Sequence, residues 1–391
     1  MTAAATPSTV SATVNEGGPR LRDARVIIMP LVLVLLGTYF AISEPAFFGA
    51  RNLSNLAIEL SLTAVLALGM LLVILPGHID LSVGSGAGLL GGVAAVLVFH
   101  YGWPAPLALA AATLAAVLIW LTMGAIIVTQ RVPAFIVTLG GLLVFRGLHW
   151  KVIGNGTIPV ARGGEQNLFS LLTTYNLPPL AGLIAAGLII AVMALAAFAS
   201  FRRLKQAGVH ADGETVFLRT FVTAQVVLLF VLLCNAHQGV PIAAVILGVV
   251  ATVVLLLTRD TPYGRYLYAI GGNEEAAVVS GVPVTRVVIC AFGLMGLITA
   301  LTGFLQTAYS GASTTTVGTN LELDAIAACV IGGASLKGGR GTVGGVLIGA
   351  LVVTVLINGM TLLSYGPEAK NIIRGTILAA AVWADVRLGK R

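Results

Sequence analysis

Charged side chains are scarce in this sequence, and several of them lie inside or beside long apolar segments. An ionisable group in such surroundings is costly, so it is usually paired or lies on the route of an ion or polar solute. No zinc-binding H-E-x-x-H, no nucleophile-bearing G-x-S-x-G and no phosphate-binding G-x-x-x-x-G-K-[ST] motif occurs. The sequence thus predicts transport rather than an enzymatic reaction, with no cofactor and no metal. The candidate charged residues are Glu59, Asp80, Arg146, Arg219, Glu322, Asp324 and Arg374.

Asp80 and Ser82 interrupt two apolar segments at a glycine-rich stretch that continues through Gly84 and Gly86. Two roles are open for them. Asp and Ser are common N-cap residues, so they could cap the free amides of a half-helix. Alternatively, their side chains could hydrogen-bond to a passing sugar. In either case we expect these four residues to lie beside a translocation pathway.

A second group of polar residues, Asn320, Glu322 and Asp324, follows a polar loop that starts near Tyr309. The same reasoning places this group on the pathway. The carboxylates could instead lie at the membrane interface, where they would need no partner.

The elements that must position these residues are predominantly apolar helices. Of the 391 residues, 58% are hydrophobic and only 9% are charged, whereas soluble domains carry about 25% charged residues. The apolar runs have the length that a helix needs to cross roughly 30 Å of hydrocarbon. The clearest runs are Val26–Ser43, Leu56–Pro76, Pro104–Val128, Pro178–Ser200, Gly239–Thr258, Val287–Leu305 and Gly341–Leu363. Weaker runs are Asp80–Phe99, Val132–His149, Thr215–Cys234, Leu321–Leu336 and Asn371–Asp385.

These runs predict an all-α, polytopic membrane protein with about ten to twelve transmembrane helices, some of them broken or re-entrant. We expect residues 1–25 to be a disordered cytoplasmic tail and residues 26–391 to be the membrane domain. Lys and Arg gather in alternate loops, which places both termini in the cytoplasm of a bacterium, inside its inner membrane. This placement of the net charge of +7 argues against a nucleic-acid partner and for membrane lipid.

Two glycine-rich segments resemble each other and suggest two related halves. The stretch from Ser82 to Gly92 aligns with the stretch from Ser335 to Gly345, with the serine and four glycines matching at a constant offset. Matching glycine interruptions in two halves of a transporter point to its pathway. A dinucleotide site is not expected at either G-x-G-x-x-G, because no strand precedes it.

The polar stretch at about 259–286 predicts a short helix between two membrane spans. Asn273 is a good N-cap, and Glu274 and Glu275 favour the positive end of a helix. Gly281 can end the helix. A helix of about two turns is marginal alone in water, so it needs a surface to dock on.

The sequence Glu275-Ala276-Ala277-x-x-x-Gly281 resembles the EAA-type coupling motif of ATP-binding-cassette (ABC) import permeases. The stretch from Gly77 to Gly84 resembles a signature of their ribose/xylose branch, and the length of the chain resembles the xylose type. The resemblance implies that Arg265, Asn273 and Glu274 also belong to the surface that docks on the ATPase subunits.

The resemblance further implies import of a monosaccharide such as xylose or a similar pentose. It implies a homodimer or a pair with a similar subunit, ABC ATPase subunits, and a periplasmic or lipid-anchored sugar-binding protein. Two alternatives stay open, an ion-coupled secondary sugar transporter and a channel. An ion-coupled transporter would also use broken helices and buried carboxylates.

Overall fold

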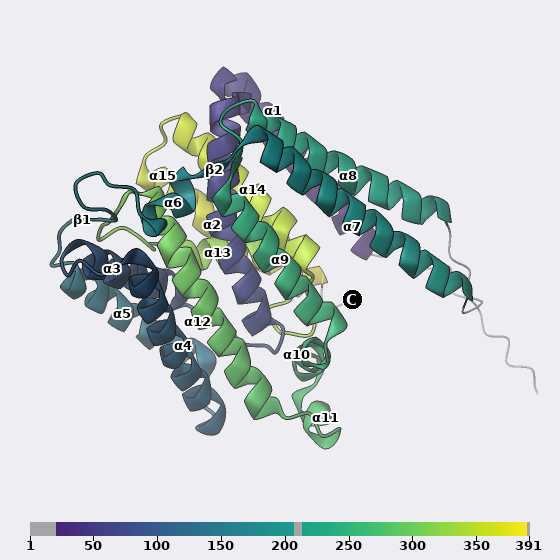
Figure 1. Ribbon diagram of the computed structural model, residues 1–391. Helices are drawn as coiled ribbons and strands as arrows, with labels where there is room; N and C mark the ends of the chain where they lie inside the picture. Colours follow the sequence, from purple (N-terminus) through teal and green to yellow (C-terminus); the bar gives the residue numbers. More distant parts are fainter. Residues whose placement is uncertain (1–20, 207–212, 389–391) are drawn as a thin grey trace, which may run out of the picture.

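The computed structural model describes residues 21–206 and 213–388, which form a bundle of α-helices with a few two-residue strands (Figure 1). Most of residues 1–25, expected as a tail, lie outside the described residues, but α1 begins at Leu21, five residues before the expected first span. In chain order the elements are α1 (Leu21–Ser43), the 3₁₀ helix η1 (Pro45–Phe48), α2 (Ala50–Ile74), α3 (Val83–Phe99), α4 (Ala105–Thr129), α5 (Ala134–Val152), β1 (Ile158–Pro159), α6 (Leu168–Thr174), β2 (Asn176–Leu177), α7 (Pro179–Gln206), α8 (Gly213–Asn235), β3 (Val240–Pro241), α9 (Ile242–Asp260), α10 (Pro262–Gly272), α11 (Glu274–Val279), α12 (Val284–Tyr309), β4 (Ala312–Ser313), α13 (Leu321–Ile331), α14 (Val343–Leu362) and α15 (Pro367–Leu388).

Within the described residues, 8 helices are long and apolar enough to cross a membrane, and α3 is a shorter apolar helix. Each apolar run expected from the sequence overlaps one of the helices, so the all-α polytopic fold is confirmed. The strands pair as two small antiparallel ladders, β1 with β4 and β2 with β3. They tie loops together and contribute little to the core.

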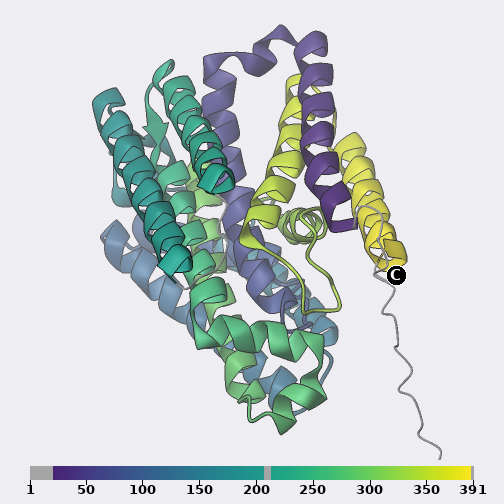
Figure 2. The ribbon, with the colours of Figure 1, turned by 90° about the vertical axis from the view of Figure 1, so that its right-hand side faces the viewer.

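The helices differ sharply in how deeply they are buried. In α2, 83% of the apolar window is buried inside the protein, compared with 11% in α7 and 6% in α8. The α7–α8 hairpin lies at the rim of the bundle, as Figures 1 and 2 show. The exposed leucines, valines and phenylalanines of this hairpin are suited to lipid, because hydrocarbon is the only solvent that does not penalise them. The bundle is therefore built around α2.

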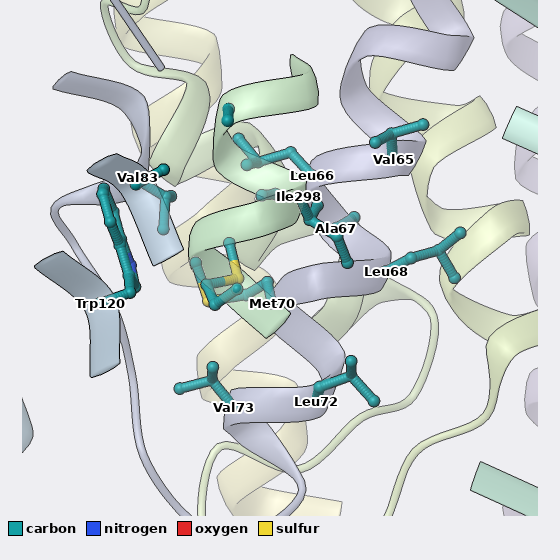
Figure 3. Packing of buried hydrophobic residues seen from close by; sticks show 14 of the residues in the cluster. Val65, Leu66, Ala67, Leu68, Met70, Leu72, Val73, Val83, Trp120 and Ile298 are labelled. Carbon is teal, nitrogen blue, oxygen red and sulfur yellow. The ribbon is translucent and has the colours of Figure 1, made fainter. Parts of the chain in front are cut away.

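The core is formed where α2, α3, α4 and α12 pack together (Figure 3). Trp120 of α4 is fully buried and packs against Gly86 of α3 and Gly296 of α12, and Met70 and Ile298 belong to the same buried cluster. Helices α3 and α12 approach closely because small residues meet there: a Cβ on Gly303 would overlap the backbone of Ala87. Such small-residue contacts are the usual way in which membrane helices gain packing energy.

Two helices inside the bundle are shorter than a crossing, and each is preceded by irregular backbone. Residues 75–82 lead into α3, and residues 310–320 lead into α13. The start of α3 meets the segment that leads into α13: Gly318 packs against the backbone of Gly84 and Gly88. This contact is near the middle of the bundle, since Gly86 also lies against Thr299, about halfway along α12. The broken helices expected from the sequence are thus present.

The two glycine-rich segments have different structures in the register in which their sequences align. Residues 83–92 are helical in α3, whereas Gly339 and Gly341 lie in the loop before α14. A likeness between halves is visible in another pairing, in which α2 and α3 correspond to α12 and α13. Each of these pairs is a long helix, an irregular segment and a short helix. The alignment of glycines in the sequence did not reveal the pairing of α2–α3 with α12–α13. Glycine occurs wherever backbones approach closely, so its matches do not mark corresponding positions.

Candidate translocation pathway and coupling helix

The first turn of α13 holds a buried carboxylate against α3. Glu322 is 4% exposed, and a Cβ on Gly84 would overlap its Oε2 atom. Oε2 has no hydrogen-bond partner among the described residues. A Cβ at position 84 would also lie 2.6 Å from the backbone oxygen of Gly318, so a larger residue would push α3 away from the segment before α13. The structure therefore brings together two of the residues predicted for the pathway.

Asp80 is fully buried and joins the loop before α3 to α4. Its Oδ1 accepts hydrogen bonds from the backbone N–H of Ser82, at 2.8 Å, and from the Ser82 hydroxyl, at 2.5 Å. Its Oδ2 accepts from Nε1 of Trp120, at 2.6 Å. Ser82 occupies the N-cap position of α3 but makes no side-chain bond to the helix. Asp80 thus fixes the loop in front of the half-helix. It does not cap the helix amides, which was one of the two roles that the sequence left open.

Asp324 forms an ion pair with Arg374 of α15, with 2.9 Å between Oδ1 and Nε. The sequence left open that Asp324 needs no partner, and this alternative is wrong: the side chain is 5% exposed, and a buried carboxylate requires a counter-charge. Asn320 donates a hydrogen bond to Asn371 of α15, at 3.0 Å. The cavity beside the ion pair has a volume of about 10 Å³, so it is closed to a sugar in this conformation.

Gly86 is packed rather than open. A Cβ there would overlap the indole ring of Trp120. In the same helix, Gly88 and Gly92 lie against the ring of His149. The glycines of α3 therefore allow the close contacts that hold the broken segment in place.

A polar network that sequence reasoning largely missed links α2, α12 and α14. Glu59 was a candidate charge, but its partners Tyr309 and Asn358 were not singled out, nor was Asn52, which bonds to Asn358. The available signal was an amide in an apolar run, since Asn358 lies inside α14. At this end of the bundle Arg162 also donates to the carbonyls of Phe99 and His100, which end α3.

The opposite end of the bundle carries α10 and α11, with α11 at the lower edge of the view in Figure 1. The predicted short helix is present as α11: Oδ1 of Asn273 accepts from the backbone N–H of Ala276, at 2.9 Å. Gly281 has a φ of +80°, which favours glycine, and it follows the end of the helix as expected. Exposed residues of this region are Arg265, Glu274, Glu275 and Ala276, whereas Ala277 faces the protein.

Helix α10 connects α11 physically to the irregular segment before α3 and to the loop before α14. A Cβ on Gly271 would overlap the Leu75 carbonyl at the end of α2, and Gly339 donates its N–H to that carbonyl at 2.9 Å. The Tyr268 hydroxyl donates to the Gly341 carbonyl at 2.8 Å. Burial raises the pKa of the Tyr268 phenol, so it remains a donor. A movement of α11 would therefore displace the loops before α3 and α14 through these contacts.

A helical bundle with two broken segments meeting at its centre, and a docked short helix at one end, defines a polytopic membrane transport protein. Residues 52–382 match the family described as branched-chain amino acid transport system / permease component. The chain belongs to this family of permeases and is a transport subunit.

Named relatives cover nearly the whole chain. The xylose transport system permease protein of Haemophilus influenzae is 38% identical over 375 residues, which is 94% of this chain and 98% of the relative. The protein of the same name from Escherichia coli K12 is 35% identical over 382 residues, 96% of this chain and 95% of the relative. The ribose import permease protein of Escherichia coli K12 is 34% identical over 365 residues, 93% and 94% of the two chains. No solved structure matches the chain.

Proposed function

We propose that this protein is the permease of an ABC importer that carries a pentose, xylose or a close relative, across the bacterial inner membrane. The observation that carries the proposal is the similarity to xylose permeases over almost the full length of both chains. The family's description names branched-chain amino acids instead. We favour a sugar because the similarity to the named sugar permeases extends from end to end.

ATP hydrolysis belongs to a partner in this proposal, and α11 is the element that meets it. Asn273, Glu274 and Glu275 begin a helix of 6 residues whose acidic first turn is exposed. Together with Ala276, Gly281 and Arg265, they form the proposed coupling surface for the ATPase subunit, while the buried Ala277 packs α11 onto the protein. α10 transmits the movement, since Gly271 contacts the segment before α3 and Tyr268 contacts the loop before α14.

The proposed pathway passes the junction of α3 and α13, where Asp80, Ser82, Gly84 and Gly86 lie on one side. Asn320, Glu322 and Asp324 lie on the other side. Buried carboxylates in a membrane protein usually mark a solute route. The close contact of Gly84 with Glu322 makes this conformation a closed one, and ATP-driven closure of the partner subunits would open it.

In the proposed orientation, the end with α10 and α11 and both termini face the cytoplasm. The positive-inside pattern of the loops supports it. A sugar-binding protein would then dock at the opposite end, which carries the strand pairs β1–β4 and β2–β3. We propose a homodimer of the permease, because two ATPase subunits need two docking surfaces.

An ion-coupled sugar transporter is not favoured, since the relatives are permease components and α11 would have no task in such a protein. Uptake of labelled xylose by a bacterium that lacks only this gene tests the proposal. Re-supplying the gene should restore uptake of xylose but not of leucine. Restoration of leucine uptake alone would replace the sugar assignment with the amino-acid one.

A further inference from the structure

The network around Glu59 is a closed set of hydrogen bonds between three helices. Tyr309 of α12 donates its hydroxyl to Glu59 Oε1, at 3.0 Å, and Asn358 of α14 donates to Oε2, at 3.0 Å. Asn52 donates to Oδ1 of Asn358, at 2.9 Å, and to the carbonyl of Phe47, at 2.9 Å. Asn358 also donates to Oδ1 of Asn52, at 3.2 Å.

Every hydrogen-bond donor of this network has a partner, whereas some of its acceptor positions are free. Each side-chain amide has two N–H groups, and those of Asn52 and Asn358 both have partners. The single hydroxyl proton of Tyr309 is donated to Glu59. A carboxylate offers about four acceptor positions, and only two of them are filled in Glu59. Further ligands of this network must therefore be hydrogen-bond donors.

The exposure of the four side chains limits which of them a ligand could contact. Asn52 and Asn358 are buried, whereas Glu59 is half-buried and Tyr309 is 37% exposed. A ligand would thus meet the carboxylate of Glu59 and the phenol of Tyr309, with the two amides holding them from behind. The sugar of the proposed function offers such donors as neutral hydroxyl groups.

The network lies at the mouth of the bundle opposite α10 and α11. Tyr309 is the last residue of α12, and Asn52 is in the first turn of α2. Glu59 is about two turns deeper along α2. The network therefore lies nearer to this end of the bundle than the junction of α3 and α13 does.

We propose that Glu59 and Tyr309 form a site that receives the hydroxyl groups of the sugar as it enters the permease. The proposal rests on the proposed function and adds a contact point that lies apart from the α3–α13 junction. The sugar donates two hydroxyl groups to the free acceptor positions of Glu59, and the exposed face of Tyr309 packs against its ring. Asn358 and Asn52 are positioning residues that orient the carboxylate.

The test separates uptake from ATP hydrolysis in proteoliposomes that contain the permease, its ATPase and saturating xylose-loaded binding protein. Glu59→Gln replaces one acceptor oxygen by a donor group, and Tyr309→Phe removes only the hydroxyl. Tyr365→Phe is the matched control, because Tyr365 is an exposed tyrosine at the same end of the bundle. The measurements are xylose taken up per ATP hydrolysed and the thermal stability of each variant.

We expect Glu59→Gln to lower xylose uptake per ATP about tenfold, the effect of losing a hydrogen bond to a charged acceptor. Tyr309→Phe should lower it roughly fivefold, and Tyr365→Phe should leave it unchanged. ATP hydrolysis stimulated by the binding protein should stay near the wild-type rate in all three. Unchanged uptake per ATP in Glu59→Gln, or a parallel loss of uptake, ATPase activity and thermal stability, would overturn the site. Failure of the wild-type protein to import xylose would instead refute the proposed function.

Discussion

The stability of the loop before α3 should depend on the negative charge and on both carboxylate oxygens of Asp80. Both oxygens act as acceptors: Oδ1 receives two hydrogen bonds from Ser82, and Oδ2 receives one from Trp120. Asp80→Asn leaves one acceptor oxygen, so its NH₂ group must face either the backbone N–H of Ser82 or the Trp120 indole N–H. Losing a hydrogen bond to a charged acceptor costs about 1.5–3 kcal/mol. We expect a loss of about 2 kcal/mol in the free energy of unfolding.

Unfolding in mixed detergent micelles measures this loss, with Asp260→Asn as control because Asp260 is exposed at the end of α9. Trp120→Phe removes the indole donor from the same bond. In the double variant the combined loss should be smaller than the sum of the two single losses by a coupling of about 1–2 kcal/mol. The reason is that the amide introduced by Asp80→Asn then faces no indole donor. Wild-type stability of Asp80→Asn, or strictly additive losses, would refute the reasoning.

Three further changes test other parts of the molecule. Glu275→Lys reverses the charge in the first turn of α11 and should reduce co-purification of the ATPase subunit at least severalfold. Gly84→Ala should cost about 1–3 kcal/mol of stability, because its Cβ would overlap the Gly318 carbonyl, whereas Gly344→Ala meets nothing within 4 Å and should be tolerated. A reporter that is active only in the cytoplasm should be active when fused after Arg391, and one that is active only in the periplasm should not.

Each of these has a result that contradicts it. Full recovery of the ATPase with Glu275→Lys, but a loss with Glu165→Lys at the other end of the bundle, would place the docking surface elsewhere. Equal stability of the two alanine variants would mean that α3 and α13 are not in close contact. Reporter activity in the periplasm would reverse the proposed orientation.

Local patterns were enough to predict the elements whose signals are contained in a few consecutive residues. The N-cap of α11, its acidic first turn and the glycine that follows all belong to one short stretch, and the structure has each of them. The apolar runs likewise predicted the helices, because length and composition alone decide whether a helix suits a membrane.

Contacts between distant parts of the chain could not be predicted in the same way. Trp120 is 40 residues from Asp80, and Asn358 is 306 residues from Asn52, so no spacing rule connects them. Asp80 looked like a helix cap because cap residues and loop-fixing residues are of the same types. The ion pair of Asp324 with Arg374 depends on how α13 and α15 pack, which their sequences do not state.

The central claim is that this permease imports a pentose only when a partner hydrolyses ATP. Its most direct test is accumulation of labelled xylose in proteoliposomes that contain the permease, its ATPase subunit and the sugar-binding protein. Xylose should accumulate with ATP on the ATPase side, but not with a non-hydrolysable analogue, and not when a proton or sodium gradient replaces ATP. Accumulation driven by an ion gradient without the ATPase subunit would rule out the dependence on ATP.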